Sequence, residues 1–156
     1  MKYQMASLSV LDQAEKVAVK AAAVMTNAQI AFTITGGPII LLDLLSECIT
    51  ANDTTASTLQ WQSNPTVGSA TTISGATTTL ASIAAGATIR LAPTALSTAL
   101  VISLAAAGGV QLGTNVSNYI TLQPGTLKMV IAVGSTTGTW KHYLRYRPLA
   151  TEVTVS

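Results

Sequence analysis

The sequence predicts an all-β protein, an antiparallel β-sandwich or jelly-roll-like barrel, with an N-terminal arm or short helix. Short runs that alternate apolar with polar or small residues recur along the chain, and glycines and prolines punctuate them. Hydrophobic residues make up 49% of the 156 residues and aromatic residues only 4%, so Val, Ile, Leu and Ala must build the core. This length suits one domain. We expect residues 1–15 to form the arm and residues 16–156 a single β domain.

The N-terminal region has two interpretations. Apolar residues at helical spacing through residues 8–25 fit one face of a helix. However, Lys16-Val-Ala-Val-Lys20 alternates as a strand does. Alanine favours helix, but helix propensity is a weak prior. We therefore expect residues 1–15 to be an arm or short helix and residues 16–25 to be the first strand.

Two longer runs follow. Ile30–Thr35 alternates apolar with polar or small residues, and Gly36-Gly37-Pro38 ends it. Ile39–Ile49 is apolar almost throughout, interrupted by Asp43 and Glu47. This run fits either a helical stripe with two carboxylates four residues apart or a long strand buried on both faces. The glycines and proline before it favour the strand.

The middle of the chain predicts short strands. Thr58–Gln62 places Leu59 and Trp61 on one face, and Ser63-Asn64-Pro65 is expected to turn the chain. Gly and Pro residues separate the later segments. The further short strands that we expect are Thr71–Ile73, Thr77–Ile83, Thr88–Leu91, Ala99–Leu104, Tyr119–Leu122 and a terminal one with Val153 and Val155.

The C-terminal third has the clearest strand pattern. Leu127–Val133 and Thr139–Arg147 both alternate, and Gly134–Gly138 between them is rich in turn residues. Two alternating runs joined by a short turn with glycines predict an antiparallel hairpin. Pro148 lacks a backbone donor, so it should mark the end of the second strand or a sheet edge.

The second of these runs has two different faces. The apolar face consists of Trp140, His142, Leu144 and Tyr146. The opposite face consists of Lys141, Tyr143, Arg145 and Arg147. Three cations and a tyrosine on one strand face suit an acidic partner surface or nucleic acid. Charges also protect edge strands from unwanted pairing, so a solvated outer face fits equally well. Because the chain uses charge so sparingly elsewhere, we take these four residues as the candidate interface.

Charge is scarce in this chain. Only 9% of the residues are charged, and from Thr54 to Thr126 the one formal charge is Arg90. A solvated surface carries roughly a quarter charged residues, so a surface this poor in charge suggests cover by other protein. The net charge of +2 is too small to predict nucleic acid as a direct partner. The composition therefore favours a protein that sits in an assembly.

Catalytic and metal-binding patterns are weak. His142, the only histidine, lies among apolar neighbours in a strand, and no G-x-S-x-G motif occurs, so we expect a packed histidine. Asp43, Glu47 and Asp53 lack the spacing of a calcium loop and are expected to pair with Lys or Arg. The lone Cys48 fits a small buried hydrophobe. We expect no enzyme, no cofactor, no metal and no small-molecule substrate.

One segment requires a membrane test. Leu91–Val110 has no charge over a length that would span a bilayer. Pro93 and the Gly108-Gly109 pair argue against a membrane helix, and a buried strand is the better interpretation. No apolar segment typical of a signal peptide follows Met1. We expect no membrane partner.

Two sequence motifs carry a family resemblance. They are Phe32-Thr-Ile-Thr-Gly-Gly-Pro-Ile-Ile40 and, after the Thr-rich middle, Gly138-Thr-Trp-Lys-His-Tyr-Leu-Arg-Tyr-Arg-Pro-Leu149. Over residues 16–155 the chain resembles small virion structural proteins of tailed bacteriophages. The resemblance implies a capsid decoration (cement) protein, a homotrimer made in the host cytoplasm. It would bind the major capsid protein on the outer surface of the virion head. The first fifteen residues lie outside the pattern and are expected to reach a neighbour.

Other functions remain open beside this one. A tail, baseplate or fibre component would be built in the same way. A secreted surface- or carbohydrate-binding module is suggested by the hydroxyl-rich strands and weakened by the shortage of aromatic residues for stacking on sugars. An enzyme is the least favoured class, because clusters of ionisable residues are missing from the sequence.

Overall fold

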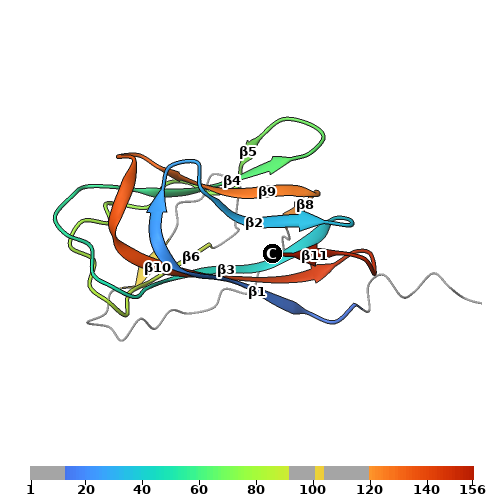
Figure 1. Ribbon diagram of the computed structural model, residues 1–156, viewed down its shortest axis with the longest axis horizontal. Helices are drawn as coiled ribbons and strands as arrows, with labels where there is room; N and C mark the ends of the chain where they lie inside the picture. Colours follow the sequence, from blue (N-terminus) through green and yellow to red (C-terminus); the bar gives the residue numbers. More distant parts are fainter. Residues whose placement is uncertain (1–12, 92–100, 104–119) are drawn as a thin grey trace, which may run out of the picture.

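The computed structural model describes residues 13–91, 101–103 and 120–156, which form two antiparallel sheets packed together without any helix (Figure 1). The predicted all-β class and sandwich architecture are therefore confirmed. Sheet A contains, in spatial order, β1 (Lys16–Thr26), β10 (Ser135–Pro148), β3 (Ile39–Cys48), β6 (Thr88–Arg90) and β7 (Val101–Ser103), with β8 (Ile120–Leu122) also paired to β3. Sheet B contains β11 (Thr154–Val155), β2 (Ile30–Thr35), β9 (Gly125–Ile131), β4 (Leu59–Pro65) and β5 (Thr71–Thr72).

Consecutive strands mostly lie in opposite sheets. The chain passes from sheet A to sheet B after β1, β3, β8 and β10, and returns to sheet A after β2, β5 and β9. The turn from β2 to β3 needs glycine at position 36, where φ is +78° and a Cβ atom would meet the carbonyl of Glu152. Such crossings make most strand pairings non-local in sequence, apart from β4 with β5 and β6 with β7.

The core lies between the two sheets and consists of the inward row of each strand. Sheet A contributes the whole apolar face of β10, and β4 and β9 contribute most of the facing row of sheet B. Large apolar side chains of this kind each stabilise the fold by about 1.5–3 kcal/mol when fully buried. The largest fully buried side chains are Trp61, Trp140, Phe32, Met25, Ile39, Leu41, Leu44, Leu59, Leu80, Ile89, Leu127 and Met129.

Strands β1 and β10 bend together from one layer toward the other, as Figure 1 shows. Their pairing has register shifts between Lys20 and Ala23 and between Val24 and Thr26. Extra residues on one strand of a pair bend it and increase its twist. Beyond the bend Met25 is buried, and its backbone N–H donates to the hydroxyl of Thr136 at 3.0 Å. The bend therefore closes one end of the sandwich.

The predicted C-terminal hairpin is wrong, although both of its strands exist. The first run forms β9, which pairs with β2 and β4 in sheet B. The second run forms β10, which pairs with β1 and β3 in sheet A and begins at Ser135, inside the predicted turn. Alternation identifies strands but contains no information on which partner each strand has. The end of β10 at Pro148 is as predicted.

Two further predictions fail in the middle of the chain. The expected turn at Ser63-Asn64-Pro65 is still strand, because all three residues pair with β9. No strand forms over Thr77–Ile83, whose backbone is held instead by isolated bonds to the start of β4 and the residues before it: the amide of Thr77 donates to Leu59 and that of Leu80 to Ser57. The run of three threonines at residues 77–79 favours strand locally, but tertiary contacts override such a preference.

The remaining predicted strands are confirmed within a residue or two wherever the structure describes them. They correspond to β1, β2, β3, β5, β6, β8 and β11, and to the described part of β7. Residues 1–12 of the predicted arm, residues 92–100 and 104–119, and with them most of Leu91–Val110, lie outside the described residues.

Asn52 provides a test of how the loops are attached to β10. Its buried side-chain oxygen accepts the backbone N–H of Gly138 at 2.8 Å, and its side-chain nitrogen donates to the carbonyl of Leu80 at 2.9 Å. Replacing Asn52 by Ala leaves both groups without a partner and is expected to lower the unfolding free energy by about 2–3 kcal/mol. Urea unfolding followed by tryptophan fluorescence measures this.

The matched control is Asn64→Ala on β4. Asn64 is half-buried, and its side chain makes no hydrogen bond with the described residues. Its replacement should change the unfolding free energy by less than about 0.5 kcal/mol. Equal losses in the two variants would contradict the assigned role of Asn52.

Candidate interface on sheet A

The four candidate interface residues lie on the outer face of sheet A, on alternate positions of β10. Lys141, Tyr143 and Arg147 are half-buried and Arg145 is exposed. Strand β10 lies between β1 and β3, so it is a central strand and not an edge. These charges therefore do not protect a free strand edge, which was one of the two interpretations that the sequence allowed.

Neighbouring strands supply the rest of this face. Directly opposite Arg145 lie Val17 of β1 and Asp43 of β3. Directly opposite Tyr143 lie Val19 of β1 and Leu45 of β3, and Glu47 lies opposite Lys141. Side chains directly opposite on neighbouring strands share a face of the sheet. We call this surface of β1, β10, β3 and β6 the outer face of sheet A.

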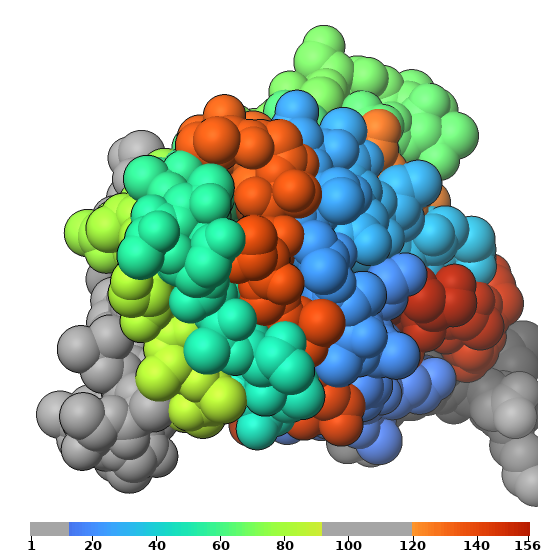
Figure 2. Space-filling view, turned by 60° about the vertical axis from the view of Figure 1, so that its left-hand side comes forward, coloured from blue at the N-terminus to red at the C-terminus, as the bar shows by residue number. Residues whose placement is uncertain are grey.

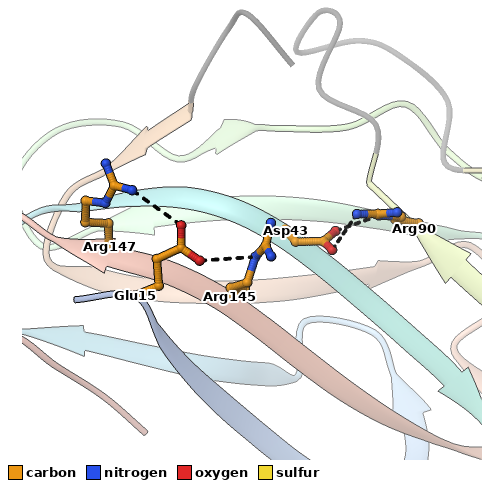
Figure 3. A network of polar contacts seen from close by, with 5 residues as sticks. All are labelled: Glu15, Asp43, Arg90, Arg145 and Arg147. Carbon is orange, nitrogen blue, oxygen red and sulfur yellow. Dashed lines mark hydrogen bonds and ion pairs between the residues drawn. The ribbon is translucent and has the colours of Figure 1, made fainter. Parts of the chain in front are cut away.

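Ion pairs run across the outer face of sheet A, as Figure 3 shows. Glu15, just before β1, lies 3.3 Å from the guanidinium of Arg147 and 4.0 Å from that of Arg145. Asp43 accepts two hydrogen bonds from Arg90 of β6, at 2.9 and 2.8 Å. This bidentate contact is stronger than a single contact between a guanidinium and a carboxylate. Exposed pairs such as those of Glu15 contribute at most about 1 kcal/mol each.

Tyr143 connects the remaining charges. Its hydroxyl donates to a carboxylate oxygen of Glu47 at 3.0 Å, and the ammonium of Lys141 lies 5.1 Å from its ring centroid. On this face Lys141, Arg145, Arg147 and Arg90 are thus accompanied by three carboxylates. The face carries charge in pairs and has little net charge, which disfavours a polyanion such as nucleic acid as its ligand.

Apolar side chains lie beside these pairs. Val17 is 59% exposed and Val19 is 53% exposed, both on β1, and Ile49 after β3 is 40% exposed. Figure 2 shows β1 and β10 side by side on the surface, in blue and orange. Exposed aliphatic groups beside paired charges can be covered by another protein, because protein interfaces combine an apolar centre with a polar rim.

Sequence reasoning missed two parts of this face. Glu15 was assigned to the arm, and Arg90 was noted only as an isolated charge. Both join the face through pairing partners distant in sequence: Glu15 through β10 and Arg90 through β3. The alternation of Lys16–Lys20 was the one signal in the sequence that Val17 and Val19 share a face.

His142 is packed in the core, as the sequence predicted. Its side chain is 2% exposed, its Nδ1 lies 2.8 Å from the hydroxyl of Ser46, and its ring meets that of Trp61 edge to face at 5.4 Å. Burial, with a smaller contribution from the charge of Lys20, lowers the pKa of His142 from 6.5 to about 4. The imidazole is therefore neutral at physiological pH, and it connects the two sheets.

The acidic residues that the sequence singled out do not converge. Asp43 pairs with Arg90, as expected of a surface carboxylate. Asp53 accepts the backbone N–H of Thr55 at 2.7 Å, and this bond lowers the pKa of Asp53. Cys48 is buried, as predicted. Among the described residues, no group of three His, Cys, Asp or Glu side chains is placed to hold a metal ion.

Comparison with known proteins identifies no relative: no family model, no curated protein and no solved structure matches the chain. Within the described ranges, no helix is long and apolar enough to cross a membrane.

The buried histidine predicts a pH dependence of stability. Because the pKa of His142 is lower in the folded state than in the unfolded chain, the unfolded state binds a proton first as the pH falls. The stabilisation is fully present above about pH 6.5 and is lost progressively toward about pH 4. Between about pH 7.5 and about pH 5 the unfolding free energy should fall by about 2 kcal/mol.

Urea titrations at several pH values measure this loss. In His142→Asn, which keeps a polar group near Ser46 but cannot titrate, the unfolding free energy should change little over the same range. A slope as steep as that of the parent protein would assign the pH dependence to other groups.

Proposed function

We propose that this protein is a structural component of a tailed-bacteriophage virion, a capsid decoration protein that binds the outer head shell and stabilises it. It acts as a homotrimer, and its partners are the major capsid protein and its own copies. The outer face of sheet A, with Lys141, Tyr143, Arg145 and Arg147 at its centre, is the contact surface. No catalytic step is part of this function.

The observation that carries the proposal is the composition of the outer face of sheet A. Its guanidinium groups already have carboxylate partners. A partner protein that covers them removes their water but does not leave their charges unpaired. The exposed Val17 and Val19 beside them gain from burial. The face is therefore suited to a protein partner with a mixed surface.

Cementing a shell follows from simple mass action. A ligand that binds the assembled, expanded lattice better than its separated subunits stabilises the lattice. Contacts of modest affinity suffice, because an oligomer that touches several capsid subunits at once gains avidity. A rigid sandwich loses little conformational entropy on docking.

Two alternatives make different use of the same features. A tail, baseplate or fibre component would present the same face to other virion proteins, and labelling of intact particles distinguishes tail from head. A carbohydrate-binding module requires exposed aromatic rings. Among the residues that the structure describes, Tyr143 is the only aromatic side chain that is not buried, and it is occupied by Glu47 and Lys141.

The decisive experiment is binding to phage capsids. The purified protein should co-sediment with expanded capsids that lack their decoration protein and should raise their rupture temperature in a calorimetric scan. The physical reason is preferential binding to the assembled lattice. Failure to bind any capsid form, together with labelling of the tail in intact virions, would contradict the decoration role and indicate a tail component.

A charge reversal tests the assigned face. Lys141→Glu places a negative charge beside Glu47 on the outer face of sheet A and should weaken capsid binding about tenfold or more. The matched control is Lys128→Glu on β9, since Lys128 is half-buried like Lys141 but belongs to sheet B. Equal losses in the two variants would show that net charge matters and the face does not.

A further inference from the structure

The edges of the two sheets are very unequal. Among the described residues, sheet B ends in β11 and β5, which have two residues each, and sheet A ends on one side in β7 and β8, which have three each. The other edge of sheet A is β1, which has 11 residues and has β10 as its one strand partner among the described residues. Natural sheets keep exposed edges short, so a long edge is a site for strand addition.

A strand added to the edge of β1 would place its side chains beside those of β1 on both faces of the sheet. Val17 and Val19 project on the outer side and are more than half exposed. Ala18 lies on the inner side, between Lys16 and Lys20. Neither lysine forms an ion pair with a described carboxylate. An added strand that carries apolar residues and one acidic group would complement this edge.

The chain itself contains such a segment. Residues 1–12 precede Gln13, which lies just before β1, and they include Ser7-Leu8-Ser9-Val10, which alternates polar with apolar residues. The acidic group of this segment is Asp12. Twelve residues in extended conformation span about 40 Å, enough to cover β1 along its whole length.

We propose that residues 1–12 of one copy add as an antiparallel strand to the free edge of β1 in a neighbouring copy. The register that places Asp12 opposite Lys16 also places Val10 opposite Ala18 and Leu11 opposite Val17. In this register Leu8 and Val10 share the inner side of the sheet, whereas Ser7 and Ser9 face solvent on the outer side. One register thus satisfies both the charge and the hydrophobic pattern.

Direct pairing of β1 with β1 of a second copy is less favourable. The antiparallel register that brings Val17 opposite Val19 places Lys16 opposite Lys20, and like charges directly opposite are destabilising. The register shift after Lys20 also interrupts a regular ladder. The segment 1–12 carries an acidic residue where β1 carries lysine, so it is the better occupant.

The inference does not depend on the proposed function. Two copies can exchange their segments reciprocally, or three can pass them around a ring. The cyclic form gives the homotrimer that we propose for the virion. In both forms each β1 edge is covered, and no long free edge remains in the oligomer.

The first test is the mass of the free protein in solution, without any capsid. Light scattering coupled to size exclusion should give a dimer or trimer for the full chain and a monomer after deletion of residues 2–12. A monomeric full chain, or an oligomer that survives the deletion, would overturn the inference. Capsid binding is measured separately, so each proposal fails by its own result.

A disulfide test fixes the register and does not depend on how the deletion variant folds. In the double variant Asp12→Cys, Lys16→Cys, the two positions lie about 13 Å apart within one extended chain, too far for an internal bridge. They lie directly opposite each other between copies, so oxidation should give covalently linked oligomers. The control pairs Asp12→Cys with Val67→Cys on the projecting β4–β5 hairpin, and it should stay unlinked. Equal linking in both would overturn the register.

Charge exchange adds a third readout. Lys16→Asp places two acidic residues opposite each other and should raise the dissociation constant of the oligomer about tenfold. The exchanged variant Asp12→Lys, Lys16→Asp should restore it. Absence of rescue would show that residues 12 and 16 do not meet.

Discussion

The fold depends on the position of β10 in the middle of sheet A. Successive side chains of a strand point to opposite faces of its sheet, and along β10 this alternation divides them between the core and the outer face. The inward row, which includes Trp140 and Leu144, fills the core. The outward row, which includes Tyr143 and Arg145, forms the centre of the outer face of sheet A. Core and candidate interface are thus two sides of one strand.

The polar contacts of β10 attach distant parts of the chain to this strand. Within the core, His142 meets Ser46 of its own sheet and Trp61 of the facing sheet. At its start, the backbone of Gly138 donates to Asn52. On the outside, Arg147 meets Glu15. A neutral buried imidazole with a hydrogen-bond partner avoids the cost of a buried charge, and this allows a histidine to occupy the core.

The unequal sheet edges relate the fold to assembly. Within the part of the chain that the structure describes, the edges at β5, β7 and β11 are short, whereas β1 presents a long edge without a second strand partner beside exposed valines. The outer face of sheet A borders this same edge. The edge of β1 and the outer face of sheet A therefore lie on the same side of the protein, where other copies and other proteins could bind next to each other. This arrangement fits a component of a larger assembly better than an isolated domain.

The candidate site was only partly predictable. The four residues on β10 follow from alternation alone, and the structure places them on one face, as expected. Their ion-pair partners do not follow, because Glu15 and Arg90 reach the face through strand pairing across the chain. The predicted hairpin between β9 and β10 was wrong because strand pairing across the chain also decided it. A short turn joins the two strands, but each of them pairs with strands distant in sequence.

By itself the sequence determined which segments are extended and which side of each strand is apolar, since both depend on a period of two residues within a few positions. Only the tertiary structure decided which sheet each strand joins, which strand is central and which strands lie at the edges. Those choices depend on non-local packing between rows of side chains, and a local pattern contains no information about its distant partner.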